Sequence, residues 1–237
     1  MSKYFFRFRH FTVNQEHAAF KVTTDSVLLG AWARIGDAGA ILDIGTGTGL
    51  LTLMAAQRSS ARIVAVEPDM ESFRQAGLNF AASPWKERIT LLNTPVQDYY
   101  SEGGSGFDAI ITNPPYFIDS LLNPDVKKAR ARHTVSLSQA DLLGAVNRLL
   151  NPGGSLHLVF PVAESGRLQS LAVAYGLFCN RRMLVKTIPE LPPSRVLMTL
   201  GREKGTCEEE VLVIEKGGRH VYSDEYVSLT KDFYLKF

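Results

Sequence analysis

The sequence predicts an α/β fold, in which a mainly parallel sheet is covered by helices on both faces and has an antiparallel edge. Three observations indicate this fold. Short apolar runs alternate with helical segments over the first two thirds of the chain, an order typical of parallel strands joined by right-handed crossovers. The runs are nearly continuous, as expected of strands buried on both faces. The last third contains extended segments instead.

The individual elements follow from apolar runs and their flanking residues. Strands are expected at residues 40–44, 62–66, 89–92, 107–112 and 155–160, and helices at 50–57, 69–82 and 138–150. Ser138 is suited to cap the third helix, and Asn151-Pro-Gly-Gly154 to end it. Extended segments follow at 178–186, 196–201 and 210–215, and the last two are expected to form an antiparallel hairpin through a polar turn.

Length and composition indicate one domain. The 237 residues contain no Pro/Gly-rich linker, so we expect a single domain, residues 1–237, with an N-terminal arm (1–35) and a core (36–237). The formal net charge of +2 means that any nucleic-acid affinity must come from local clusters of basic residues.

Two separated cysteines, Cys179 and Cys207, are typical of a cytosolic protein, although their spacing leaves a disulfide open. The absence of a long apolar run or a signal-peptide pattern predicts a soluble, cytoplasmic protein without a membrane span, and a monomer is compatible with the sequence.

A glycine-rich turn, Asp43-Ile-Gly-Thr-Gly-Thr-Gly49, joins the first expected strand to the first helix. Glycines at positions 45, 47 and 49 (Gly45, Gly47 and Gly49) allow a tight turn and the close approach of a ligand. Their spacing differs from the G-x-G-x-x-G of dinucleotide sites. The carboxylate of Asp43 would repel a pyrophosphate but attract an ammonium group, so the turn favours a nucleoside cofactor with a methionine moiety.

Carboxylates also follow the next two strands. Glu67 ends the second strand, where it can accept hydrogen bonds from both ribose hydroxyls, and Asp98 follows the third, where it could receive an adenine amino group. Taken alone, each acid is more often a surface residue. At consecutive strand ends they favour a nucleoside site, because ligands bind outside the carboxyl ends of parallel strands.

The tetrapeptide Asn113-Pro-Pro-Tyr116 directly follows the fourth strand. Two prolines stiffen the backbone and hold Asn113 extended. The side-chain oxygen of Asn113 and the carbonyl of Pro114 can then accept both hydrogens of an amine on a planar group, while Tyr116 offers a face for stacking. Holding that amine towards tetrahedral geometry localises its lone pair for attack on an electrophilic methyl group, which needs chiefly positioning. The sequence offers no metal-ligand set and no convincing general base, and the alternative is a loop that merely ends a strand.

These motifs resemble the class I methyltransferases that modify N6 of the adenine just 3′ of the anticodon in valine tRNA. The glycine-rich and Asn-Pro-Pro-Tyr motifs are shared by many amino-methyltransferases, whereas the segment 21–32 and the tail 232–235 are narrower. The likeness covers nearly the full length and rests on residues 11–15, 21–32, 42–50, 83–85, 113–117, 131–133 and 232–235.

The resemblance implies a Rossmann-like fold with a seven-stranded sheet, S-adenosylmethionine as cofactor, S-adenosylhomocysteine as product and tRNA as substrate. It further implies that Lys21, Thr23 and Asp25 close over the methionine end of the cofactor, and that Asn113 borders the cofactor as well as the base. A basic run follows the catalytic loop and could contact RNA, although a charge run is more often a solvated face. Its residues are Lys127, Lys128, Arg130, Arg132 and His133. Two further candidates for RNA contact are the aromatic and basic segment 4–10 and a cluster of Arg181, Arg182 and Lys186.

Three other readings stay open. A related family that methylates glutamine side chains of release factors at N5 shares Asn-Pro-Pro-Tyr, although it usually has an extra N-terminal helical domain for which this chain has no room. An RNA-binding protein with a vestigial cofactor site would bind RNA but no cofactor. A dinucleotide-dependent oxidoreductase is opposed by the glycine spacing.

Overall fold

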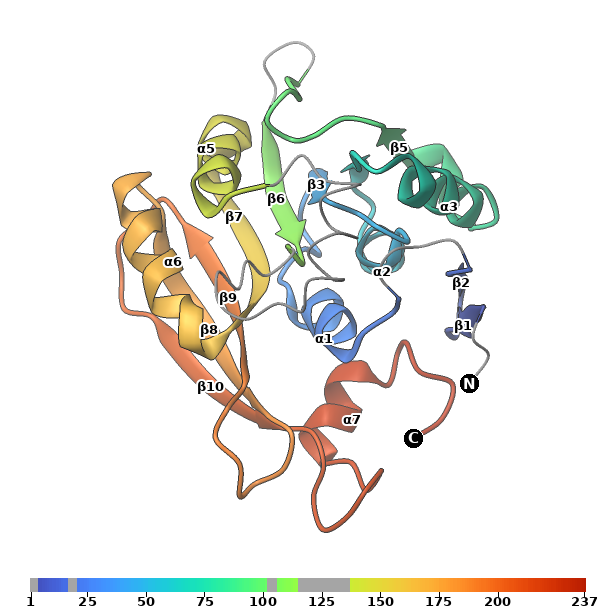
Figure 1. The fold of residues 1–237 in the computed structure, drawn as a ribbon, viewed down its shortest axis with the longest axis vertical. Helices are drawn as coiled ribbons and strands as arrows, with labels where there is room; N and C mark the ends of the chain where they lie inside the picture. Colours follow the sequence, from blue (N-terminus) through green and yellow to red (C-terminus); the bar gives the residue numbers. More distant parts are fainter. Residues whose placement is uncertain (1–3, 17–20, 102–105, 115–136) are drawn as a thin grey trace, which may run out of the picture.

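The structure, a computed structural model, describes residues 4–16, 21–101, 106–114 and 137–237. An eight-stranded sheet forms its centre, and a separate two-stranded sheet lies near the N-terminus (Figure 1). The large sheet has the strand order β10-β8-β9-β7-β6-β3-β4-β5, and every neighbouring pair is parallel except the two that involve β9. The predicted α/β class with a mainly parallel sheet is confirmed.

The large sheet consists of β3 (Ala40–Ile44), β4 (Arg62–Val66), β5 (Ile89–Leu92), β6 (Phe107–Thr112), β7 (Leu150–Pro161), β8 (Phe178–Lys186), β9 (Arg195–Gly201) and β10 (Glu208–Val213), and the small sheet of β1 (Phe5–Arg7) and β2 (Thr12–Asn14). The helices are α1 (Thr24–Trp32), α2 (Leu50–Arg58), α3 (Met70–Ala81), α5 (Gln139–Leu149), α6 (Val162–Ala174) and α7 (Asp224–Thr230), with a short 3-10 helix η1 (Lys86–Arg88) after α3. All strands and helices expected from the sequence are present, and β7 begins five residues earlier than expected.

The sheet differs from the expectation in its last three strands. It has eight strands rather than seven, and β9 and β10 do not form the expected hairpin. The hairpin consists of β8 and β9, joined by residues 187–194, while β9 also pairs antiparallel with β7. Strand β10 is the edge strand and runs parallel to β8.

Side-chain character explains this order. In β9, the side chains of Val196, Leu197, Met198 and Leu200 are all at most 1% exposed, so the strand is buried on both faces and needs neighbours on both sides. Strand β10 instead begins with three glutamates, which suit an edge because charge there opposes pairing with other chains. The sequence pattern of β9 is that of an interior strand, and the expectation of a β9–β10 hairpin overlooked it.

Apolar clusters on both faces hold the sheet between its helices. Helices α5 and α6 pack on one face, whereas α1, α2 and α7 pack on the other. A third cluster brings Phe8, Phe11 and Val13 of the N-terminal arm against α1, α2 and α3. Helix α5 begins with a capping box in which Ser138 and Asp141 exchange hydrogen bonds, so the predicted cap at Ser138 is confirmed.

Within the described ranges, no helix is long and apolar enough to cross a bilayer. In that same part of the chain, no three His, Cys, Asp or Glu side chains are grouped so that they could hold a metal ion. The thiols of Cys179 and Cys207, which lie on β8 and just before β10, are free, with their Sγ atoms 3.2 Å apart.

Candidate active site

The strand ends bring the predicted site residues to one edge of the sheet. Strands β4, β3 and β6 are parallel neighbours, with Ile44 opposite Val66 and Asp43 opposite Ile111. The loops that follow these strands therefore leave the sheet side by side. Thr112, at the end of β6, donates its hydroxyl to the carbonyl of Ile44 at 2.8 Å and fixes the two strand ends together.

The glycine-rich turn has the left-handed backbone that its composition predicts. Gly45, Gly47 and Gly49 have φ angles of +69°, +57° and +84°, a region that L residues with a Cβ rarely adopt. The amides of Gly45 and Thr46 both donate to the carbonyl of Val66, at 2.9 and 3.2 Å, which attaches the turn to β4. A Cβ on Gly45 or Gly47 would meet nothing within 4 Å, so open space lies over these two residues.

Asp43 lies beneath the turn and is fully buried. Its Oδ2 accepts the hydroxyls of Thr46 and Thr52, at 2.6 and 2.7 Å, whereas its Oδ1 is buried without a hydrogen-bond partner among the described residues. Burial raises the pKa of Asp43 to about 6, although the two hydroxyls lower it in part. A buried carboxylate oxygen without a donor is costly, and a cationic ligand group would offset that cost.

Glu67 follows β4 directly and is 7% exposed. Its Oε2 accepts the amide of Gly47 at 2.8 Å, and its Oε1 accepts the amide of Asp69 at 3.0 Å. Burial raises the pKa of Glu67, and these two amides counteract the effect in part. Each carboxylate oxygen has further lone pairs, so the side chain can also accept two hydroxyl donors.

Asn113 follows β6 and donates its side-chain Nδ2 to the hydroxyl of Ser26 on α1 at 2.8 Å. This bond links the Asn113 side-chain amide to α1. Sequence reasoning did not identify Ser26, nor Thr46 and Thr52 as the partners of Asp43. The hydroxyl of Thr46, three residues after the carboxylate of Asp43 near the end of β3, was visible in the sequence, but no local signal connects Ser26 with a residue 87 positions away.

The remaining four residues predicted to bind the cofactor differ in their exposure and in their partners. Thr23 caps α1, accepting the amide of Ser26 at 3.3 Å, and the side chain of Lys21 is exposed. Asp25 forms an ion pair with Arg195 at 2.9 Å, so it links α1 to the start of β9. Asp98 is exposed, in a turn after β5. Roles for these four residues stay predictions.

Several predicted residues lie outside the described ranges. They are Tyr116 and the basic residues Lys127, Lys128, Arg130, Arg132 and His133. Pro114 is described and buried.

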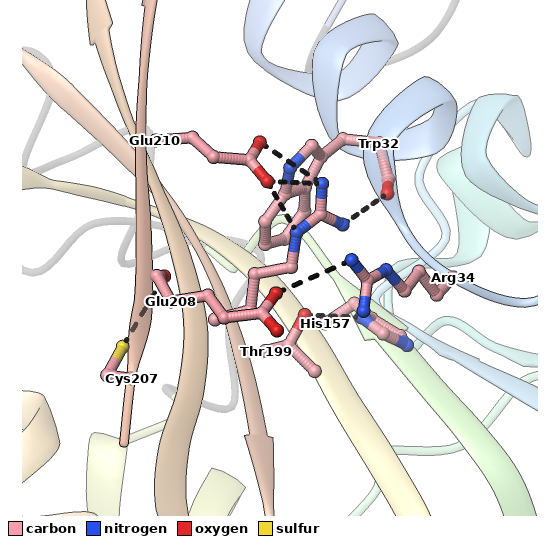
Figure 2. A network of polar contacts seen from close by, with 8 residues as sticks. Trp32, Arg34, His157, Thr199, Cys207, Glu208 and Glu210 are labelled. Carbon is pink, nitrogen blue, oxygen red and sulfur yellow. Dashed lines mark hydrogen bonds and ion pairs between the residues drawn. The ribbon is translucent and has the colours of Figure 1, made fainter.

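The two arginines of the third basic cluster are paired with acids, whereas Lys186 donates to the carbonyl of Pro189. Arg181 makes two hydrogen bonds to the carboxylate of Glu210, at 3.1 and 3.2 Å, and its guanidinium lies 4.3 Å from the ring centroid of Trp32. Arg182 is paired with Glu209. Figure 2 shows the network around the first pair, with Glu210, Trp32 and Arg34 labelled. Because the two guanidinium charges are neutralised locally, the cluster is a weaker candidate for RNA contact than its sequence indicates.

Comparisons with known proteins show which proteins this chain resembles. A family model described as a methyltransferase small domain matches residues 18–167. The tRNA1(Val) (adenine(37)-N6)-methyltransferase of Bacteroides fragilis (strain YCH46) is 45% identical over 237 residues, which cover 100% of both chains. The protein of the same name from Trichodesmium erythraeum (strain IMS101) is also 45% identical, over 98% of both chains. A solved predicted O-methyltransferase from Agrobacterium tumefaciens has the same fold, with a TM-score of 0.65, 19% identity and coverage of 88% of this chain and 96% of its own.

Proposed function

The chain belongs to the tRNA1(Val) (adenine(37)-N6)-methyltransferase family, and we propose that it transfers a methyl group from S-adenosylmethionine to N6 of the adenine 3′ of the anticodon in valine tRNA. The observation that carries the proposal is the arrangement of Asn113 next to the glycine-rich turn, at the shared edge of β3 and β6. A side chain that can bind an amine and a site for a nucleoside cofactor then lie beside each other. That juxtaposition is what methyl transfer to an amine requires.

The residues at the strand ends fit the parts of this cofactor. The buried Oδ1 of Asp43 suits the ammonium of the methionine moiety, directly or through water. The carboxylate of Glu67 suits the ribose hydroxyls, and the open space over Gly45 and Gly47 leaves room for the ligand backbone. When bound, the cofactor supplies a methyl group made electrophilic by a positively charged sulfur.

Asn113 and Pro114 provide the positioning that the reaction needs. The Asn113 side-chain oxygen and the Pro114 carbonyl accept the two hydrogens of the adenine amine, and Ser26 holds the Asn113 amide in the required orientation. Hydrogen bonds to both hydrogens pull the nitrogen lone pair out of conjugation with the ring and direct it to the methyl carbon. The proton is released to water after the transfer.

An adenine in an anticodon loop can enter such a site at modest cost. A loop base needs little unpairing, so less free energy is spent on flipping it than in a duplex. The site at the strand ends then has to accommodate a single planar base. Contacts of residues 127–133 with the RNA stay a prediction of the same proposal.

A direct test is mass spectrometry of nucleosides after incubation with unmodified transcripts of valine tRNA. We expect N6-methyladenosine in the transcript, and none in a matched transcript with guanine in place of adenine 37. The alternative substrate is a glutamine side chain of a protein, whose amide offers a similar planar NH2 group. Incubation of the enzyme and labelled S-adenosylmethionine with total tRNA and, separately, with total protein distinguishes the two substrates. Label in the protein fraction alone would reject the tRNA assignment.

A further inference from the structure

The side chain of Asn79 on α3 connects two segments that are distant in sequence. It is 1% exposed, and the helix carries it towards both the N-terminal arm and the glycine-rich turn. Contacts between α3 and β2 place the arm directly against the helix.

All hydrogen-bonding atoms of the Asn79 amide have partners in this position. Its Nδ2 donates to the carbonyl of Asn14 and to the carbonyl of Thr48, both at 2.8 Å. Its Oδ1 accepts the amide of Asn14 at 2.9 Å. Asn14 is the last residue of β2, and Thr48 lies between two glycines of the turn.

Only a primary amide can satisfy this arrangement at this length. The position requires two donors and one acceptor on one planar group, and a carboxylate offers no donor. An aspartate there would face two carbonyl oxygens, and an alanine would remove the partner of three backbone groups, of which the Thr48 carbonyl makes a buried bond and the two groups of Asn14 make partly buried ones. The requirement is therefore specific to asparagine.

The bond to Thr48 completes the attachment of the turn. The Val66 carbonyl holds its first residues, Glu67 holds the amide of Gly47, and Asn79 holds the carbonyl of Thr48. The first two attachments come from the end of β4, whereas the third comes from α3 and the arm. The position of the last part of the turn therefore depends on the arm.

The arm also reaches the other side of the site. Gln15, the residue after Asn14, is buried, and its Oε1 accepts the amide of Val22 at 2.9 Å. Val22 precedes the segment that leads into α1, the helix whose Ser26 orients Asn113. Two neighbouring arm residues are thus connected to both walls of the candidate site.

We propose that Asn79 is a positioning residue that ties the N-terminal arm to the glycine-rich turn, so that the docked arm sets the affinity for S-adenosylmethionine. This inference rests on the proposed function, because it assumes that the turn binds that cofactor. Because the side chain of Asn79 is 1% exposed and bonds to backbone groups of Asn14 and Thr48, we expect its loss to raise the KM for the cofactor and to leave kcat nearly unchanged.

The test compares two variants that break the tie from opposite sides. Asn79→Asp keeps the size of the side chain but removes both donors. Asn14→Pro removes the backbone amide that donates to the Oδ1 of Asn79. In the β1–β2 pair, the amide of the next residue, Gln15, donates to the carbonyl of Tyr4, so the amide of Asn14 points away from β1. Proline is tolerated at strand positions whose amide does not pair with the neighbouring strand. The matched control is Ser83→Ala, which removes a buried hydroxyl that donates to the carbonyl of Phe80 at the end of α3 and accepts the amide of Trp85, so that neither of these bonds involves the arm or the turn.

Hydrogen exchange of the ligand-free protein is measured first, on peptides covering residues 5–16 and 43–54. We expect faster exchange in both peptides for Asn79→Asp and Asn14→Pro, and wild-type exchange for the control. Calorimetry with S-adenosylhomocysteine should then show a Kd about tenfold higher for both variants, with the KM for S-adenosylmethionine rising by a similar factor and kcat within twofold of the wild type.

Other outcomes have distinct meanings. A Kd within twofold of the wild type for both variants, with unchanged exchange in residues 43–54, overturns the inference. If Asn79→Asp does not fold, Asn14→Pro decides alone. If the wild-type protein does not bind S-adenosylhomocysteine, the proposed function fails, whereas the exchange data still decide whether the tie exists.

Discussion

Replacing Asp43 by asparagine should stabilise the ligand-free protein while weakening its hold on the cofactor. The asparagine oxygen can still accept the hydroxyls of Thr46 and Thr52, so the local packing is retained. What the substitution removes is a negative charge that is fully buried and that has one oxygen without a donor among the described residues. A site selected to bind a cation is expected to carry such a cost until the ligand arrives.

The size of the effect follows from the raised pKa of Asp43. Its folded-state pKa is about 6, compared with an ordinary value of 3.8. Because the folded state holds the proton more tightly, stability falls as the pH rises from 3.8 to 6, and the cost is fully present above pH 6. At about 1.4 kcal/mol for each pH unit, the cost is about 3 kcal/mol at pH 8 and about 0.5 kcal/mol at pH 4. Loss of the Asp43 charge also removes a repulsion that raises the pKa of Glu67, an effect of the same sign.

Denaturant unfolding of the ligand-free wild type and of Asp43→Asn between pH 4 and pH 8 measures this difference. We expect the variant to be more stable by about 3 kcal/mol at pH 8 and nearly equal at pH 4. Calorimetry at pH 8 should show that S-adenosylhomocysteine binds the variant at least about 100-fold more weakly, since a buried cation then lacks its partner. A variant that is less stable by the same amount at every pH, with unchanged affinity, would refute the reasoning.

Three further substitutions test other parts of the site. Asn113→Ala should lower kcat by about 100-fold or more while the Kd for S-adenosylhomocysteine stays within threefold, as single-turnover kinetics and calorimetry can show; wild-type turnover would disprove its role. Gly49→Ala places a Cβ 2.3 Å from the ring of Phe80 at a φ of +84°, and we expect it to lower the free energy of unfolding in denaturant by about 2–3 kcal/mol. The control is Gly36→Ala, whose Cβ meets nothing within 4 Å and which should lower it by less than about 0.5 kcal/mol. Equal losses of stability would contradict the packing argument. Burial lowers the pKa of His157 from 6.5 to about 3, so the free energy of unfolding falls as the pH falls through this range, by about 2 kcal/mol at pH 5. His157→Gln should reduce this dependence of stability on pH in unfolding experiments. An unchanged dependence would exclude His157 as its source.

The fold and the centre of the site were predictable because their signals are local. An apolar run bounded by glycines identified β3 and a second apolar run identified β4, and parallel pairing then required that Asp43, Glu67 and Asn113 meet at one edge. Each of these residues lies at or next to a strand end, so its place followed from the order of the strands. No knowledge of distant contacts was needed.

The parts that the sequence did not predict depend on contacts between distant segments. Ser26 approaches Asn113 only because α1 packs across the sheet, and Asn79 reaches Asn14 only because the arm folds back on α3. The position of β9 between β7 and β8 is likewise a matter of strand order, which turn residues suggest but do not determine. The apolar side chains on both faces of β9 were the available clue.

A crystal structure of the protein with S-adenosylhomocysteine tests the central claim most directly. It should show the ribose hydroxyls within hydrogen-bonding distance of the Glu67 carboxylate, the ligand ammonium near Asp43, and the sulfur facing the side chain of Asn113. A ligand bound elsewhere, with the glycine-rich turn empty, would contradict the account.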